Sequence, residues 1–134
     1  MPEINTVRRG GASYTTPVTL ALNTKIEEGH AVAINSDGLA VPMAVAVGNK
    51  FAGRCETTSD STGSDEPVRM AVRRGCEFRW ANATAADAVT QSDVGNKAYF
   101  VDSHTVSADS DTNTRPEAGQ IIAVEAAGVF VMAQ

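Results

Sequence analysis

Two histidines, His30 and His104, are the side chains of this sequence best suited to acid–base chemistry. Serines and aspartates are frequent enough to compose a Ser-His-Asp set around either one, but that chemistry depends on geometry, which composition does not supply. His104 lies in the segment VDSHTV, where a polar side chain at the tip of a turn is the ordinary expectation. We therefore predict that the protein is not an enzyme.

Carboxylates with the spacing of a cation site occur once, in the segment DSDTN. Asp109, Asp111 and Asn113 match the first half of a calcium-binding loop. The pattern then fails, because Thr114 stands where the loop needs glycine and Gln120 stands where it needs a bidentate glutamate. We expect a solvated loop there, and a second solvated loop at TSDSTGSDE, which could hold a hard cation only weakly.

The two cysteines, Cys55 and Cys76, are too few for a disulfide framework. Together with two distant histidines they make a weak zinc-ligand set. Free cysteine is usually buried, so we expect two buried thiols on neighbouring strands. The sequence thus predicts neither a cofactor nor a metal.

The tetrapeptide VGNK occurs twice, at residues 47–50 and 94–97. A Gly-Asn-Lys turn lacks the aligned N–H groups and the following helix that a phosphate-binding loop needs. The residues that follow the two copies also differ, so we interpret both as turns that lead into strands. A better internal match joins AGRCE (52–56) to AGQIIAVE (118–125), because each begins with Ala-Gly, ends in Glu and is followed by a return strand.

Charge is distributed unevenly along the 134 residues. Residues 1–80 carry nine Lys/Arg and nine Asp/Glu, whereas residues 81–134 carry two and seven, which accounts for the whole net charge of −5. An acidic chain with a pI near 4.9 is a poor binder of nucleic acid phosphates. The longest apolar run, LAVPMAVAV (39–47), is too short to cross a bilayer, and the N-terminal residues lack the apolar core of a signal peptide. We expect neither nucleic acid nor membrane as a partner.

The elements that must position these residues are predicted to be β-strands. Short runs rich in valine, isoleucine and alanine alternate with turn clusters, which is typical of an all-β protein, here a small β-barrel of short antiparallel strands. Hairpins are predicted over 30–43, with its turn at Asp37-Gly38, and over 97–108. Residues 83–91 are the one plausible short helix, and the closing strands 119–125 and 129–134 tie the C-terminal part into the sheet.

The first twenty residues differ from the rest. They are polar, interrupted by glycine and barely periodic, so we predict an extended N-terminal arm over 1–20 and a single β-barrel domain over 21–134. Within the arm, the segment INTV is suited to adding a strand to a partner's sheet. Arg8 and Arg9 belong to a single RRGG segment on an acidic chain, so we expect them to meet an acidic patch on a protein partner.

The order of these segments resembles that of the small β-barrel capsid decoration, or cement, proteins of tailed bacteriophages. The similarity covers about residues 30–134: an apolar hairpin, AGRCE, the strands PVRMAVRRGCEFRW, the segment DVGNKAYFVDSHTVS, and the closing EAGQIIAVEAAGVFVMAQ. The resemblance implies a structural protein, made in the host cytoplasm, that binds the major capsid protein on the outer capsid surface of the virion. It also implies a homotrimer and a stabilising role.

Six residues are the candidate contacts with the capsid: Ile4, Val7, Arg8, Arg9, Tyr14 and Trp80. Trp80 is the only tryptophan, so a core position is the simpler expectation for it and an interface position is the alternative. Other functions stay open at this point. The protein could be another phage structural component, such as a head-fibre base or a tail module. It could also be a small carbohydrate-binding barrel, although the 5% aromatic content argues against that class.

Overall fold

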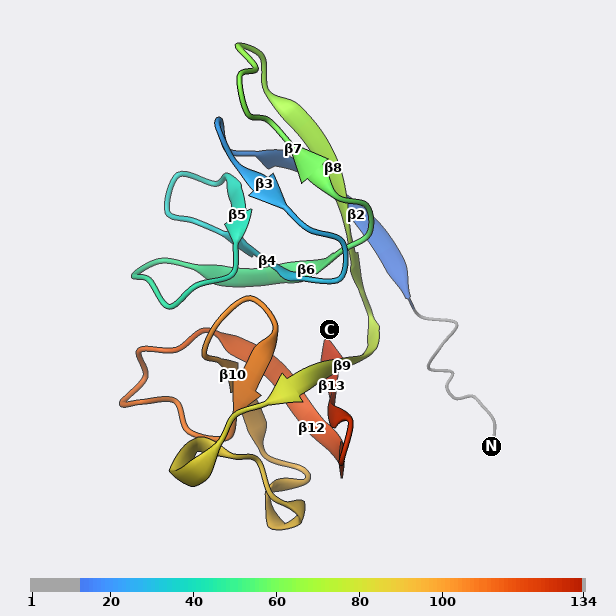
Figure 1. Ribbon diagram of the computed structural model, residues 1–134, viewed down its shortest axis with the longest axis vertical. Helices are drawn as coiled ribbons and strands as arrows, with labels where there is room; N and C mark the ends of the chain where they lie inside the picture. Colours follow the sequence, from blue (N-terminus) through green and yellow to red (C-terminus); the bar gives the residue numbers. More distant parts are fainter. Residues whose placement is uncertain (1–12, 134) are drawn as a thin grey trace.

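The computed structural model describes residues 13–133 and confirms the all-β class, with small closed barrels (Figure 1). The strands of the first half are β2 (Tyr14–Leu20), β3 (Lys25–Ile26), β4 (Ala31–Ile34), β5 (Ala40–Pro42), β6 (Lys50–Cys55), β7 (Ser59–Asp60) and β8 (Val68–Arg74). Those of the second half are β9 (Cys76–Asn82), β10 (Lys97–Phe100), β11 (Thr105–Ser107), β12 (Glu117–Glu125) and β13 (Gly128–Ala133).

The strands divide between two closed barrels, where the sequence had suggested that one barrel holds them all. Barrel 1 consists of β2, β5, β4, β6 and β8, and barrel 2 consists of β10, β11, β9, β13 and β12. The short strands β3 and β7 pair with each other at the end of barrel 1. A single residue, Gly75, connects β8 to β9 and thereby joins the two barrels (Figure 1).

The two barrels have the same topology. In each, the first strand is parallel to the third and antiparallel to the fifth, the second and third form a hairpin, and the fourth lies between the second and the fifth. Strands β2, β4, β5, β6 and β8 thus correspond in order to β9, β10, β11, β12 and β13. Residues 14–133 therefore form a tandem repeat of one five-stranded unit, and both predicted hairpins occupy the same place in their units.

The internal match between AGRCE and AGQIIAVE marks this repeat. Gly53 lies in β6 and Gly119 in β12, which are the corresponding fourth strands, and each lies beside a shift of register against the hairpin strand. Both have positive φ, 149° and 134°. A Cβ atom at either position would collide with a backbone carbonyl of the fifth strand, Arg73 O or Met132 O. Only glycine fits at these two bulges.

The VGNK segments do lead into strands, as predicted, because Lys50 is the first residue of β6 and Lys97 is the first residue of β10. They enter different members of the unit, the fourth strand in barrel 1 and the second in barrel 2. The repeated tetrapeptide therefore does not follow the repeated topology.

The expected arm over residues 1–20 must be corrected for its last part, because residues 14–20 form β2 of barrel 1. This strand pairs with β8 over its whole length, from Tyr14↔Arg74 to Leu20↔Val68. Its threonines and Val18 suit a strand, and Leu20 is buried. Sequence inspection missed it because polar threonine and Pro17 obscure the alternation. Residues 1–12 lie outside the described residues.

The barrels share one aromatic core. Phe51 of barrel 1 packs against Trp80 and Phe100 of barrel 2, with ring centroids 6.1 and 4.9 Å away. Ala31, Ala33 and Met43 also join this cluster from barrel 1. A second, smaller core of aliphatic side chains, including Leu20, fills barrel 1 itself. The two units are therefore packed on each other and not merely linked.

The predicted helix is reduced to short 3-10 turns, and the predicted C-terminal strand forms. The predicted helical stretch contains a 3-10 turn at Ala85–Asp87, and another follows at Gln91–Asp93. The last strand, β13, lies between β12 and β9, so the C-terminal part is tied into barrel 2 as expected.

Candidate binding surface at the junction of the barrels

A groove of about 440 Å³ lies where the two barrels meet, and both VGNK segments line it. Asn49 and Lys50 contribute from the start of β6, and Gly95 and Lys97 contribute from the start of β10. The packing of Phe51 against barrel 2 brings these two strand starts together. The structure thus places the two copies of the tetrapeptide at one site, which the sequence did not suggest.

The groove is basic although the chain is acidic. Its lining includes Lys50, Arg74 and Lys97 against the single carboxylate of Glu117, three positive charges and one negative, which leaves +2. Lys97 and Glu117 form an exposed ion pair, with Nζ and Oε1 3.4 Å apart. Lys50 has no carboxylate partner among the described residues, so its ammonium group is available to an incoming anion.

Arg74 holds the inner wall of the groove. Its Nη1 donates a hydrogen bond to the carbonyl oxygen of Phe51 over 3.4 Å, and it lies at the end of β8 directly before Gly75. This contact ties the groove to the aromatic core behind it. The wall is therefore set by packing between the barrels.

A second hollow, with an apolar and a polar side, adjoins the groove and shares Asn49 with it. One side is the segment 45–48, in which Val47 is fully exposed and Val45 is 44% exposed. The other side is the segment 113–116. Two exposed valines next to a basic groove form a surface suited to a partner that offers both an apolar and an acidic side chain.

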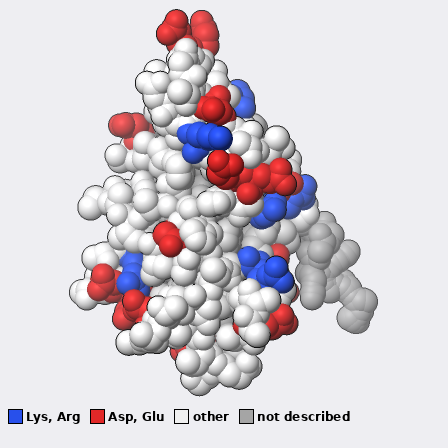
Figure 2. All heavy atoms as spheres, in the orientation of Figure 1, with Lys and Arg blue, Asp and Glu red and all other residues white. Residues whose placement is uncertain are grey.

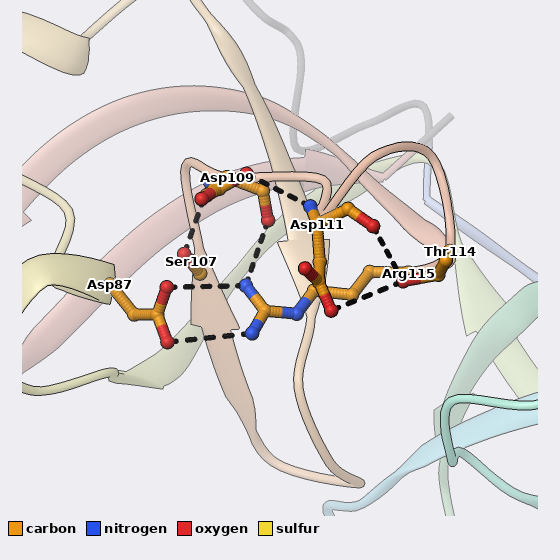
Figure 3. Close-up of polar contacts among 6 residues, drawn as sticks. All are labelled: Asp87, Ser107, Asp109, Asp111, Thr114 and Arg115. Atoms are coloured by element: carbon orange, nitrogen blue, oxygen red, sulfur yellow. Dashed lines mark hydrogen bonds and ion pairs between the residues drawn. The ribbon is translucent and has the colours of Figure 1, made fainter.

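The loop that forms the second side is held by its own polar contacts (Figure 3). Arg115 lies in the centre: its guanidinium contacts both carboxylate oxygens of Asp87 at 3.4 Å and donates to the carbonyl oxygen of Asp109 at 3.0 Å. Asp109 Oδ1 accepts the backbone N–H of Asp111, and the hydroxyl of Thr114 donates to the carbonyl of Asp111. Of the three side chains that resembled a calcium loop, Asp109 caps the backbone and Asp111 and Asn113 accept from hydroxyl groups. The cation beside Asp109 is Arg115.

The two histidines, far apart in the sequence, are brought together in the structure. Their ring centroids are 5.4 Å apart, and Ser103 Oγ lies 2.8 Å from His30 Nδ1 and 3.4 Å from His104 Nδ1. Asp102 contacts the same nitrogen of His104, at 3.3 Å. A catalytic relay needs serine and aspartate on opposite ring nitrogens, so this cluster does not have the geometry of a Ser-His-Asp triad. It does join the barrels, because Ala31 donates its N–H to the carbonyl of Ser103.

The cysteines are free, with Cys55 buried in β6 and Cys76 half-buried in β9. They lie in different barrels, so the expectation of neighbouring strands was wrong. Desolvation raises the pKa of both thiols. Among residues 13–133, no group of three or more His, Cys, Asp or Glu side chains is placed to hold a metal ion.

The predicted capsid contacts fall into three groups. Ile4, Val7, Arg8 and Arg9 lie outside the described residues. Tyr14 is half-exposed at the first position of β2, whereas Trp80 is 3% exposed in the shared core and cannot contact a partner directly. The sequence reading missed Val47 and Lys50, because LAVPMAVAV looked like strand or core. The signal that could have revealed an exposed turn was Pro42 on one side and Gly48 on the other.

Comparisons of the chain with models of protein families, with curated proteins and with solved structures gave no match. Within the described part of the chain, no helix has the length and apolar character needed to span a membrane.

Proposed function

We propose that the protein is a capsid decoration protein of a tailed bacteriophage, which binds the major capsid protein on the outer surface of the head and stabilises the shell. The order of its sequence segments supports this class. The structural observation that carries the proposal is the anchoring of β2: seven consecutive residues pair with β8, and the strand begins at the half-exposed Tyr14. Barrel 1 therefore fixes the positions of Ser13 and Tyr14, which directly follow the N-terminal residues 1–12 in the sequence.

Contacts around this point strengthen the anchor. Arg73 donates from Nη1 to the hydroxyl of Ser13 over 3.0 Å, and its Nε lies 2.9 Å from Glu56 Oε1. Glu56 also binds Arg54 at 3.1 Å. A short polar network thus holds the first described residue against barrel 1, next to Tyr14.

In the proposed role, residues 1–12 and Tyr14 contact the shell. Ile4 and Val7 supply apolar contacts, and Arg8 and Arg9 meet acidic side chains of the major capsid protein. Weak, identical contacts repeated over a symmetric shell add through multivalency, so each one need contribute only a few kcal/mol. The protein gathers there as homotrimers in the virion.

The test is co-sedimentation with purified mature and unexpanded phage shells. We expect the full chain to bind the mature shell and a protein lacking residues 2–11 to stay folded but bind at least tenfold more weakly, about 1.4 kcal/mol. The truncation must end before Ser13, because removal of residues 2–16 would also delete three residues of β2. The replacement of the exposed Arg79 by glutamate is the control, since Arg79 lies on β9, away from β2. Equal shell binding by the full and truncated chains would refute the role of the arm, and no binding to either shell would refute the function.

A further inference from the structure

The far end of barrel 1 carries an exposed tip that the proposed function does not use. The loop between β7 and β8 presents Asp65 and Glu66, both exposed, and Figure 2 shows acidic side chains at this extreme end of the molecule. The loop between β2 and β3 lies beside it and presents Leu22, which is 54% exposed. We call Leu22, Asp65 and Glu66 the tip.

The two loops that form the tip are hydrogen-bonded to each other. Ser61 is fully buried, and its hydroxyl accepts the N–H of Thr24 at 2.9 Å. The side-chain oxygen of Asn23 accepts the N–H of Gly63 at 3.2 Å. These bonds tie the two loops together, so the leucine and the carboxylates are presented from one ordered structure.

The junction of the barrels has the complementary chemistry. Val45 and Val47 offer exposed apolar surface, and Lys50 offers an ammonium group with no carboxylate partner in the described part of the chain. If the two surfaces met, the apolar side chain of the tip would face the two valines, and the carboxylates of the tip would face Lys50. Within one molecule these surfaces cannot meet, because the tip lies at the end of barrel 1 that is remote from barrel 2 (Figure 1).

We propose that the tip of one copy docks into the groove and hollow at the barrel junction of a second copy. Asp65 and Glu66 pair with Lys50 on the basic side of the groove, and Leu22 packs on Val45 and Val47. Since the two surfaces differ, the contact is head-to-tail, and its repetition gives a closed ring or an open chain of copies. This inference concerns the free protein and stands whether or not the protein binds a shell.

The test uses the full chain without shells, with self-association followed by sedimentation velocity over a range of concentration and salt. We expect reversible association that weakens as salt rises. Lys50→Glu and the pair Asp65→Lys/Glu66→Lys should each raise the dissociation constant about tenfold. The protein carrying all three changes should recover part of the association lost in Lys50→Glu, because the pairing at position 50 then has its charges exchanged while Arg74 and Lys97 keep theirs.

Two further variants separate apolar from ionic contact. Leu22→Asn and Val47→Asn should each weaken association by a similar factor at low and at high salt, because salt does not screen apolar contact. Arg79→Glu is the matched control for Lys50→Glu, since Arg79 is an exposed base on β9 and lies outside the junction. It should leave association within about twofold of the parent chain.

Three results would overturn the proposal. The first is a free chain that stays monomeric at every concentration, which would leave the junction to another partner. The second is an equal loss of association in the Lys50 and Arg79 variants. The third is a folded triple variant that fails to recover. Shell binding is measured separately, so neither proposal can fail on the result of the other.

Discussion

Single residues decide whether each barrel can close. Gly53 and Gly119 stand at corresponding bulges, and each brings its backbone against a carbonyl of the neighbouring strand. The Ala-Gly pairs could be recognised as equivalent from the sequence alone, because their surroundings repeat. The reason why glycine is required could not be predicted from the sequence. A Cβ atom at position 119 would collide with the carbonyl of Met132, which lies thirteen residues further along the chain.

Gly119→Ala should therefore be far more destabilising than a glycine replacement in open space. Gly119 has a φ of 134° and meets a carbonyl, whereas Gly38 has a φ of 81° in a hairpin turn with no atom within 4 Å of an added Cβ. We expect Gly38→Ala to lower the free energy of unfolding by about 1–2 kcal/mol and Gly119→Ala to lower it by roughly 3 kcal/mol or more, since strain and overpacking add. Urea unfolding measures both. Similar losses for the two variants would show that β12 yields at its bulge.

The two thiols give a second prediction at this scale. Desolvation raises the pKa of Cys55 in the folded protein, so the fold penalises its thiolate. The stability that this contributes is fully present below the ordinary thiol pKa and is lost as pH rises through the raised value. We expect the free energy of unfolding to fall more steeply with pH on the alkaline side for the parent chain than for Cys55→Ala, whose value at neutral pH should itself be lower because a buried side chain is truncated. Parallel alkaline profiles would contradict this.

At the scale of elements, most strands could be predicted from the sequence, β2 being the main exception, whereas strand partnership could not. Both hairpins and the closing strands followed from local apolar runs and turn residues. The division into two barrels depends on which face each strand presents, and short runs of alanine and valine do not specify that. The strand β4 shows why: Val32 points into the aliphatic core of barrel 1, whereas Ala31 and Ala33 face the aromatic core shared with barrel 2. Both of its faces are apolar, so no alternation distinguishes them.

The shared core predicts that the barrels unfold as one cooperative unit. Phe51→Ala should lower the free energy of unfolding by about 3 kcal/mol, because it removes the ring that joins barrel 1 to Trp80 and Phe100. The fluorescence of Trp80 reports on the shared core, and far-ultraviolet circular dichroism reports on both barrels. We expect the two signals to coincide in the parent chain. Tyr14→Ala, at a half-exposed site on the same barrel, should change stability by less than about 1 kcal/mol. Separate transitions in the parent chain would show that the barrels are independent.

At the scale of the whole molecule, the candidate surface arises only from the meeting of distant segments. Lys50 and Lys97 lie in two copies of one tetrapeptide, but their proximity depends on the packing of barrel 1 on barrel 2. The basic character of the groove is likewise hidden in the acidic composition, because the cations come from three separate strands. Val47 is fully exposed, whereas its apolar neighbours in the sequence indicated a strand or core position.

If the protein reinforces a shell, decorated shells should rupture at a higher temperature than bare ones. Arg8→Glu/Arg9→Glu should reduce that gain, and the reduction should be smaller at high salt, where exposed ion pairs are screened. Differential scanning calorimetry of bare and saturated shells measures the effect. Arg79→Glu serves again as the control for charge. Equal rupture temperatures for bare and saturated shells would refute a stabilising role even where binding occurs.

The pairing of β2 with β8 also determines how the molecule would respond to force. A pull on residue 13 loads the Tyr14↔Arg74 end of the ladder. If the opposing load enters through Gly75, at that same end, the strand pairs open one at a time, as in a zipper. If it enters through the tip, beyond Val68 at the other end, all seven pairs are sheared together and the resistance is much greater. A copy restrained by its tip would thus hold a tensioned N-terminal segment far more firmly than a copy restrained through barrel 2.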